Sequence, residues 1–515
     1  MSRSEPAPHD GTRIGVDTTH GRIEGAWHHG VARFAGVPFA APPLGDLRFR
    51  PPQPVEPWDG VRDATEFGPI CPQNPSMMDA LFGGESEVWN EDCLHLNVWT
   101  TDVEPDEQRP VMVWIHGGGF EMGSGSSPLY HGEAFARSGV VLVTLNYRLG
   151  ALGFLELGGL DPSYAGSGNV GLLDQVAALE WVRANIASFG GNPQDVTIFG
   201  ESAGGMSVSL LMAMPRARGL FHRVIAQSGA AAAGRDPADA RADATTFLAE
   251  AELDSVQAAV DADVTTLLAA HSRMSAARMA DPEAAVRAHG NPLAFLPFRP
   301  VADGGEVPAD PLAAIADGAA AGVGLVVGTT LEEWKLFALA TPPAPDEAAL
   351  EDRVGLLCDR PTEAIALYRE EHPDASLADL ECAVLTDVVF RVPASDLADA
   401  QSAHATVFQY RWDWSSPALG GMIGASHAIE IPFVFDLVED QRLHVFVGPE
   451  APKPLARAVH EAWATFASTG VPAADGLPEW PQVAADRRPV MRFDTASSVL
   501  EDPQATTLRF WSEQR

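Results

Sequence analysis

The residues Gly200-Glu201-Ser202-Ala203-Gly204 form a G-x-S-x-G motif between an apolar run, VTIF at 196–199, and a helix-forming stretch that begins at Ala203. A serine hydroxyl is a weak nucleophile, and a sharp strand-to-helix turn exposes its Oγ for attack on an acyl carbon. The strand before the motif and the helix after it make this reading specific. They predict that Ser202 is a nucleophile and that Glu201, directly beside it, tunes the charge of the site.

A second motif, HGGGF at 116–120, follows the apolar run VMVWI. An attacking serine generates an oxyanion that backbone N–H groups can stabilise, and glycine lets them approach without an obstructing side chain. Taken alone, the motif fits an ordinary glycine turn equally well. Together with the serine turn, it predicts an oxyanion hole formed by the amides of Gly118, Gly119 and Ala203.

A serine nucleophile needs a histidine as general base and a carboxylate that orients this histidine. Among the fifteen histidines, His427 in GASHAIEIPFVF is the one expected on a loop late in the chain. The carboxylate is either Glu332 or Glu333, because both follow the buried-strand run GLVVGTT, and periodicity does not choose between them. Ser228, in AQSG, is a further candidate support for the site, with ordinary packing at a strand end as the alternative.

These residues must be positioned by the elements around them, which alternate between buried strands and helices. Such alternation is typical of an α/β protein with a central, mostly parallel sheet flanked by helices. Short apolar pieces with glycines at 13–40 predict a small N-terminal antiparallel sheet, and helical stretches at about 231–290 and 342–393 predict cap insertions. We expect one domain over 1–515, with 1–12 as a flexible tail. The apolar runs behind this prediction lie at 111–115, 140–146, 196–199 and around residues 225 and 327.

Composition excludes several classes of partner. The chain of 515 residues has 34 Lys+Arg against 70 Asp+Glu, a net charge of −36, so neither nucleic acid nor an anionic membrane is expected to bind. No apolar run approaches the roughly 18 residues of a spanning helix, and the first residues lack the apolar run of a secretory signal. We therefore expect a cytoplasmic protein. The four cysteines have neither zinc-site nor C-x-x-C spacing, so no metal and no cofactor is expected.

Over nearly its whole length the chain resembles the type-B carboxylesterases, which are α/β-hydrolases that include bacterial para-nitrobenzyl esterases, animal carboxylesterases and cholinesterases. The similarity lies in EDCLHLNVW, VMVWIHGGGF, the GESAGG box, GTTLEEW and GASHAIEIPFVF. It implies the α/β-hydrolase fold and a serine esterase that acts through an acyl-serine. The nucleophile would be Ser202, the base His427 and the acid Glu333. Trp334 stands where the family usually has glycine after this acid.

The resemblance also bears on the cysteines and on the substrate. Cys71 and Cys93 match a pair that forms a disulfide in secreted members, whereas a reducing cytosol favours thiols, so their state stays open. We expect a small-molecule ester, hydrophobic or aromatic, with amides, carbamates and lactones as alternatives. A non-catalytic binding protein of the same fold is a further alternative, and the oligomeric state cannot be deduced from the sequence. Candidate pocket residues, which could equally belong to the core, are Met77, Met78, Leu81, Phe82, Phe120, Phe295 and Phe298.

Overall fold

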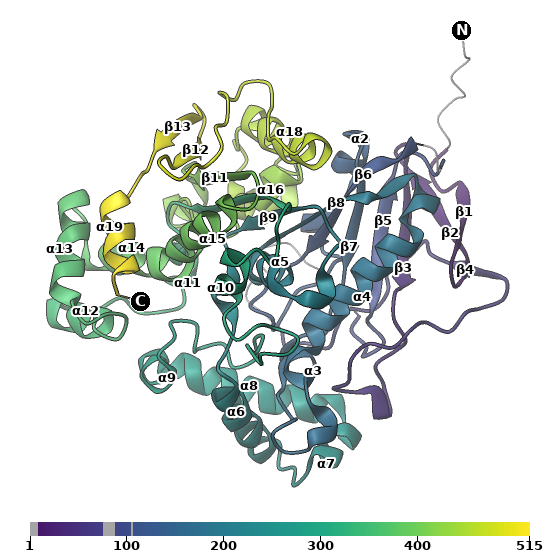
Figure 1. The fold of residues 1–515 in the computed structure, drawn as a ribbon, viewed down its shortest axis with the longest axis horizontal. Helices are drawn as coiled ribbons and strands as arrows, with labels where there is room; N and C mark the ends of the chain where they lie inside the picture. The colour runs from purple at the N-terminus through teal and green to yellow at the C-terminus, as the bar shows by residue number, and fades with distance from the viewer. Residues whose placement is uncertain (1–8, 76–87, 105–106, 515) are drawn as a thin grey trace.

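The computed structural model describes residues 9–75, 88–104 and 107–514. Over these ranges a 13-stranded mixed sheet crosses the molecule, and helices cover both of its faces (Figure 1). The strands from β7 to β12 in the order below run parallel, which confirms the predicted central sheet. The order is β1 (Arg13–Thr18), β2 (Gly21–His28), β3 (Val31–Pro38), β5 (His95–Thr100), β7 (Val141–Leu145), β6 (Arg109–Ile115), β8 (Gly191–Glu201), β9 (Arg223–Gln227), β10 (Gly324–Thr330), β11 (Val407–Trp412), β12 (Pro489–Phe493) and β13 (Ser498–Glu501), with β4 (Val61–Asp63) paired to β2.

The N-terminal strands β1, β2 and β3 lie at one end of the main sheet. They are antiparallel, as expected, but β3 pairs with β5, so that the hairpin strands extend the main sheet. The sequence of β3, VARFAGVP, explains this arrangement, because the strand is buried along most of its length and can occupy an interior position. A bulge between Phe34 and Val37 marks the junction.

Alternate residues of the central strands pack into two different cores. In β6, Val111, Val113 and Ile115 belong to one core, while Met112 and Trp114 belong to the other, as the two-residue period of a strand requires. The first core also contains α4 and α5, and the second contains α18. The helices of the main body are α2 (Glu133–Arg137), α3 (Gly150–Phe154), α4 (Val170–Asn185), α5 (Ala203–Ala213), α10 (Pro311–Ala316), α11 (Trp334–Phe337), α16 (Ile431–Val434), α17 (His444–Val447) and α18 (Lys453–Thr469).

Two helical groups extend from this body. One lies beside α3 and consists of α6, α7, α8 and α9, and the other brings α12, α13 and α14 together with the C-terminal helix α19 (Figure 1). Over the described ranges, no helix is long and apolar enough to cross a membrane. The bounds are α6 (Pro237–Glu250), α7 (Val256–Asp261), α8 (Val264–Ala280), α9 (Pro282–His289), α12 (Glu347–Val354), α13 (Pro361–Glu371), α14 (Leu377–Thr386), α15 (Val392–Ser402) and α19 (Ala505–Ser512).

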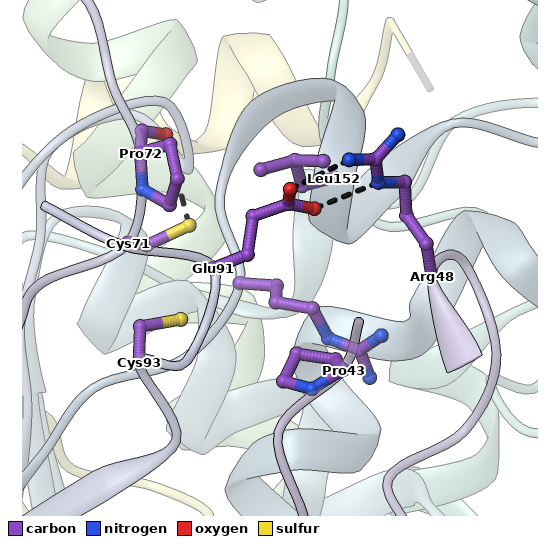
Figure 2. A pocket seen from close by; sticks show the side chains of 8 residues that line it. Pro43, Arg48, Cys71, Pro72, Glu91, Cys93 and Leu152 are labelled. Carbon is purple, nitrogen blue, oxygen red and sulfur yellow. Dashed lines mark hydrogen bonds and ion pairs between the residues drawn. The ribbon is translucent and has the colours of Figure 1, made fainter. Parts of the chain in front are cut away.

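Cys71 and Cys93 are both buried and both free thiols. They line a cavity of about 10 Å³, about the size of one water site, which Figure 2 shows beside the ion pair of Arg48 and Glu91. The guanidinium of Arg48 donates to the two carboxylate oxygens of Glu91 at 2.7 and 2.6 Å, and also to carbonyl groups at the end of α7. This arginine therefore ties the N-terminal part of the chain to the first helical group.

Candidate active site

Ser202 stands at the turn between β8 and α5 with φ 57° and ψ −124°, a strained combination for a residue with a side chain. Its N–H donates to the carbonyl of Gln227 at 2.9 Å, which ties the turn to β9. Two residues later, a Cβ on Gly204 would lie 2.0 Å from the carbonyl oxygen of Ile115, so only glycine lets α5 approach β6 this closely. The side chain of Ser202 is partly exposed. The fold thus presents this hydroxyl at the carboxyl end of the sheet.

His427 and Glu333 lie together close to this turn. The Nδ1 atom of His427 is 2.6 Å from Oε2 of Glu333, and both side chains are buried. The other carboxylate oxygen of Glu333 accepts the N–H of Thr330 at 2.8 Å, and the backbone N–H of His427 donates to the carbonyl of Glu333. The Thr330 bond holds the Glu333 carboxylate, and the backbone bond holds the two residues side by side.

Glu332, the alternative left open by the sequence, points elsewhere. Its carboxylate accepts the ammonium of Lys335 at 3.0 Å and the N–H of Ala425 at 3.0 Å, and its side chain is 36% exposed. The geometry therefore brings Glu333, and not Glu332, to His427.

Glu201 approaches the opposite side of the same imidazole. Its Oε1 lies 3.2 Å from Nε2 of His427, an ion-pair contact without hydrogen-bond geometry. Burial raises the pKa of Glu201 to about 7, although the charge of His427 opposes this shift. Burial alone would lower the pKa of His427, but the negative charges of Glu201 and Glu333 outweigh it and raise this pKa to about 9.

A third buried carboxylate, Glu430, escaped the sequence analysis. It accepts hydrogen bonds from the Gln227 amide at 2.9 Å and from the Tyr410 hydroxyl at 2.7 Å, and Trp463 donates to Gln227 at 3.1 Å. Burial raises the pKa of Glu430 to about 8, against the effect of these two hydrogen bonds. Its place three residues after His427 in GASHAIEIPFVF could have indicated that Glu430 lies near the site, but nothing in the sequence indicated that it is buried.

The loop HGGGF follows β6 and reaches the same edge of the sheet. Gly118 and Gly119 adopt φ of 105° and 64°, which favour glycine, and a Cβ on Gly118 would lie 2.2 Å from a backbone oxygen of Met122. Within the described part of the chain, the N–H groups of Gly118, Gly119 and Ala203 donate no hydrogen bond to another protein group. They are available to an oxygen of a bound molecule.

The remaining candidates are Ser228 and the residues expected either in a pocket or in the core. Ser228 is buried at the end of β9 with φ 48°, and its Oγ has no hydrogen-bond partner among the described residues. Phe120 and Phe298 are fully buried and pack against Phe154 and Phe247, which agrees with the core alternative for both residues. Phe295 is partly exposed. The other pocket candidates, Met77, Met78, Leu81 and Phe82, lie outside the described residues.

Comparisons with known proteins show the family to which the chain belongs. The model of the carboxylesterase family matches residues 13–511. The para-nitrobenzyl esterase of Bacillus subtilis (strain 168) is 39% identical over 95% of this chain and 96% of its own length. The phenmedipham hydrolase of Pseudarthrobacter oxydans is 35% identical over 92% and 94%. A solved PNB esterase superposes with a TM-score of 0.85 at 37% identity, over 97% of this chain and 99% of its own.

A solved carboxylesterase of Geobacillus stearothermophilus gives a TM-score of 0.83 at 38% identity, over 96% and 99% of the two chains. The chain therefore belongs to the carboxylesterase family, with the α/β-hydrolase fold. It is a carboxylic ester hydrolase that acts on small-molecule esters, which confirms the activity expected from the sequence.

Proposed function

We propose that this enzyme cleaves esters through an acyl-serine, with Ser202 as nucleophile, His427 as general base and Glu333 as the carboxylate that orients the base. The observation that carries this proposal is the buried contact of 2.6 Å between His427 Nδ1 and Glu333 Oε2. This contact fixes the tautomer with a proton on Nδ1 and leaves Nε2 to accept the serine proton. The strained turn at Ser202, at the same edge of the sheet, supports the assignment of the nucleophile.

In this mechanism Ser202 Oγ attacks the ester carbonyl while His427 takes its proton. The amides of Gly118, Gly119 and Ala203 stabilise the oxyanion, and their positive-φ loop and helix start support this role. The imidazolium then protonates the leaving alcohol, and a water activated by His427 releases the acid. Glu201 stabilises the imidazolium from the side opposite Glu333.

The substrate we propose is an ester with a hydrophobic or aromatic group. The rings of Phe337 and Phe390 lie 5.1 and 4.8 Å from the His427 ring, and the Leu296 side chain would touch a Cβ on Gly119 at 3.3 Å. Apolar surface thus lies beside both the base and the oxyanion donors. The name of the Bacillus relative, para-nitrobenzyl esterase, points to an aromatic group as well.

Hydrolysis of para-nitrophenyl esters tests the assignment. We expect Ser202→Ala to fall to the background rate and Glu333→Gln to lose about 10³- to 10⁴-fold in kcat, because the glutamine amide cannot stabilise the imidazolium. Glu332→Gln is the matched control and should stay within about threefold of the wild type. Equal losses in the two glutamine variants, or full activity of Ser202→Ala, would overturn the assignment.

Acyl chain length and an added aromatic ester test the substrate class separately. We expect kcat/KM to rise from the acetate to the butyrate ester, and para-nitrobenzyl acetate to be cleaved. A preference for a short, charged acyl group would contradict the apolar surroundings of His427.

A further inference from the structure

The helical run from Leu377 to Ser402 is interrupted by one π turn, Asp387–Arg391, between α14 and α15. Pro393 explains the interruption, because it has no N–H and its ring would clash with the carbonyl of Val389 in a regular α-helix. Single π turns inside helices occur frequently at functional sites. This one lies against the loop of residues 330–334 that carries Glu333, called the acid loop below.

Arg391, the last residue of the π turn, binds the start of that loop. Its Nη2 donates to the carbonyl oxygens of Thr330 at 3.0 Å and Leu331 at 2.9 Å. Thr330 also donates its own N–H to the Glu333 carboxylate. Arg391 therefore holds the residue to which one oxygen of Glu333 is bound.

Two further residues of this helical run, Thr386 and Phe390, contact the residues around Glu333 and His427. Thr386 Oγ1, directly before the π turn, accepts the N–H of Trp334 at 3.1 Å, on the other side of Glu333. The ring of Phe390 lies 4.8 Å from the ring of His427. The π turn and the residue before it thus contact the backbone on both sides of Glu333 and the ring of His427.

The π turn is itself anchored in the second helical group. Asp387 is buried and forms an ion pair with Arg391, and the Tyr368 hydroxyl donates to its other oxygen at 2.7 Å. Trp511, on the C-terminal helix α19, donates its indole N–H to the Tyr368 oxygen at 2.8 Å. A chain of hydrogen bonds therefore leads from α19 to the acid loop.

We propose that Arg391 is a positioning residue for the reaction, and that the π turn transmits the position of α13 and α19 to Glu333. This inference rests on the proposed function of Glu333. Methionine at position 391 leaves the two carbonyl oxygens without the arginine donor and removes the ion pair of Asp387, which keeps only its hydrogen bond from Tyr368, so that the acid loop can shift. Misplacement of a catalytic group by about 1 Å costs up to about 100-fold in rate.

The variants Arg391→Met and Arg391→Lys test the proposal, with Arg488→Met as control. Arg488 lines the same cavity of about 30 Å³ as Arg391 but pairs with Asp399 and Asp502 instead of the acid loop. We expect Arg391→Met to lower kcat about 10- to 100-fold with KM within about twofold, and Arg391→Lys to recover part of the loss. The control should keep the wild-type kcat.

The pH dependence of kcat/KM separates positioning from general destabilisation. The acidic groups that act on His427 are Glu201, Glu333 and Glu430, and a displaced Glu333 stabilises the imidazolium less. The acidic limb of the profile should therefore move to lower pH in the Arg391 variants and stay in place in Arg488→Met. If Arg391→Met does not fold, the Arg391→Lys variant decides, because it keeps the charge beside Asp387.

A folded Arg391 variant with the wild-type kcat and the wild-type acidic limb would overturn the proposal. So would an equal loss in Arg488→Met, since the effect would then follow from the cavity as a whole. Failure of the proposed function is distinguishable, because Glu333→Gln would then retain activity in the same assay.

Discussion

Replacing Glu201 with glutamine removes a negative charge 3.2 Å from Nε2 of His427 while keeping the shape of the side chain. At an effective dielectric constant of about 20, a full charge pair at this distance interacts with about 5 kcal/mol. The attraction at neutral pH is smaller, because the pKa of Glu201 itself is raised to about 7 and the carboxyl is only partly ionised. We therefore expect the pKa of His427 to fall by about 1 unit or somewhat more, which corresponds to about 1.4 kcal/mol.

The sign follows from the charge of the base. His427 must be neutral to accept the serine proton, so kcat/KM rises with pH through its pKa, which the two carboxylates hold at about 9. Loss of Glu201 moves this acidic limb to lower pH. The same loss weakens stabilisation of the imidazolium in the transition state, so the plateau at high pH falls by about tenfold.

These two effects have one origin and therefore cancel at low pH. Well below the limb, the free enzyme and the transition state both contain an imidazolium, and Glu201 stabilises both. The profiles of the wild type and Glu201→Gln should thus merge at low pH and diverge above about pH 7, in a stopped or pH-independent assay of ester hydrolysis. Glu332→Gln, which changes a carboxylate paired with Lys335, should leave the profile in place.

A plateau that falls with an unmoved limb would refute this reasoning, because Glu201 would then act on the substrate or the fold instead of on the charge of His427. A limb that moves to higher pH would refute it as well.

Three further predictions concern stability and thiol state. Arg148→Met leaves the fully buried carboxylate of Asp174 without its partner and should lower the free energy of unfolding by about 3 to 5 kcal/mol, measured by urea denaturation. The exposed control Arg137→Met should change the free energy of unfolding by less than about 0.5 kcal/mol. Gly204→Ala places a Cβ 2.0 Å from the Ile115 carbonyl oxygen, so we expect a lower midpoint, and an unchanged one would contradict the tight contact of α5 with β6. Protein denatured without reductant should titrate four thiols, and a count of two would indicate a disulfide.

Much of the fold followed from local patterns in the sequence. The central strands are short apolar runs buried on both faces, and the turn from β8 into α5 was visible as a strand, a small-residue motif and a helix in succession. The antiparallel N-terminal strands were predicted, but their connection to the main sheet was not, because the pairing of β3 with β5 joins segments about 60 residues apart and no local pattern encodes it.

The site was only partly accessible from the sequence for the same reason. Glu332 and Glu333 both follow a buried strand, and only the position of Lys335 and of His427 in space separates them. Arg391 was invisible as a candidate, since its partners Thr330 and Leu331 lie about 60 residues earlier in the chain. Residues that act on the reacting groups directly leave motifs, whereas residues that hold those groups leave few.

The electrostatics of the site depend on a similar long-range assembly. Glu201, Glu333 and Glu430 come from three separate segments, are all buried, and all act on the charge of His427. Burial raises the pKa of Glu201 and of Glu430, and the negative charge of Glu333 raises both pKa values further. The same charges make His427 a stronger base and keep it protonated to higher pH, so a gain in base strength is offset by a smaller fraction of active enzyme at neutral pH. Glutamine at position 201 should reverse both effects together.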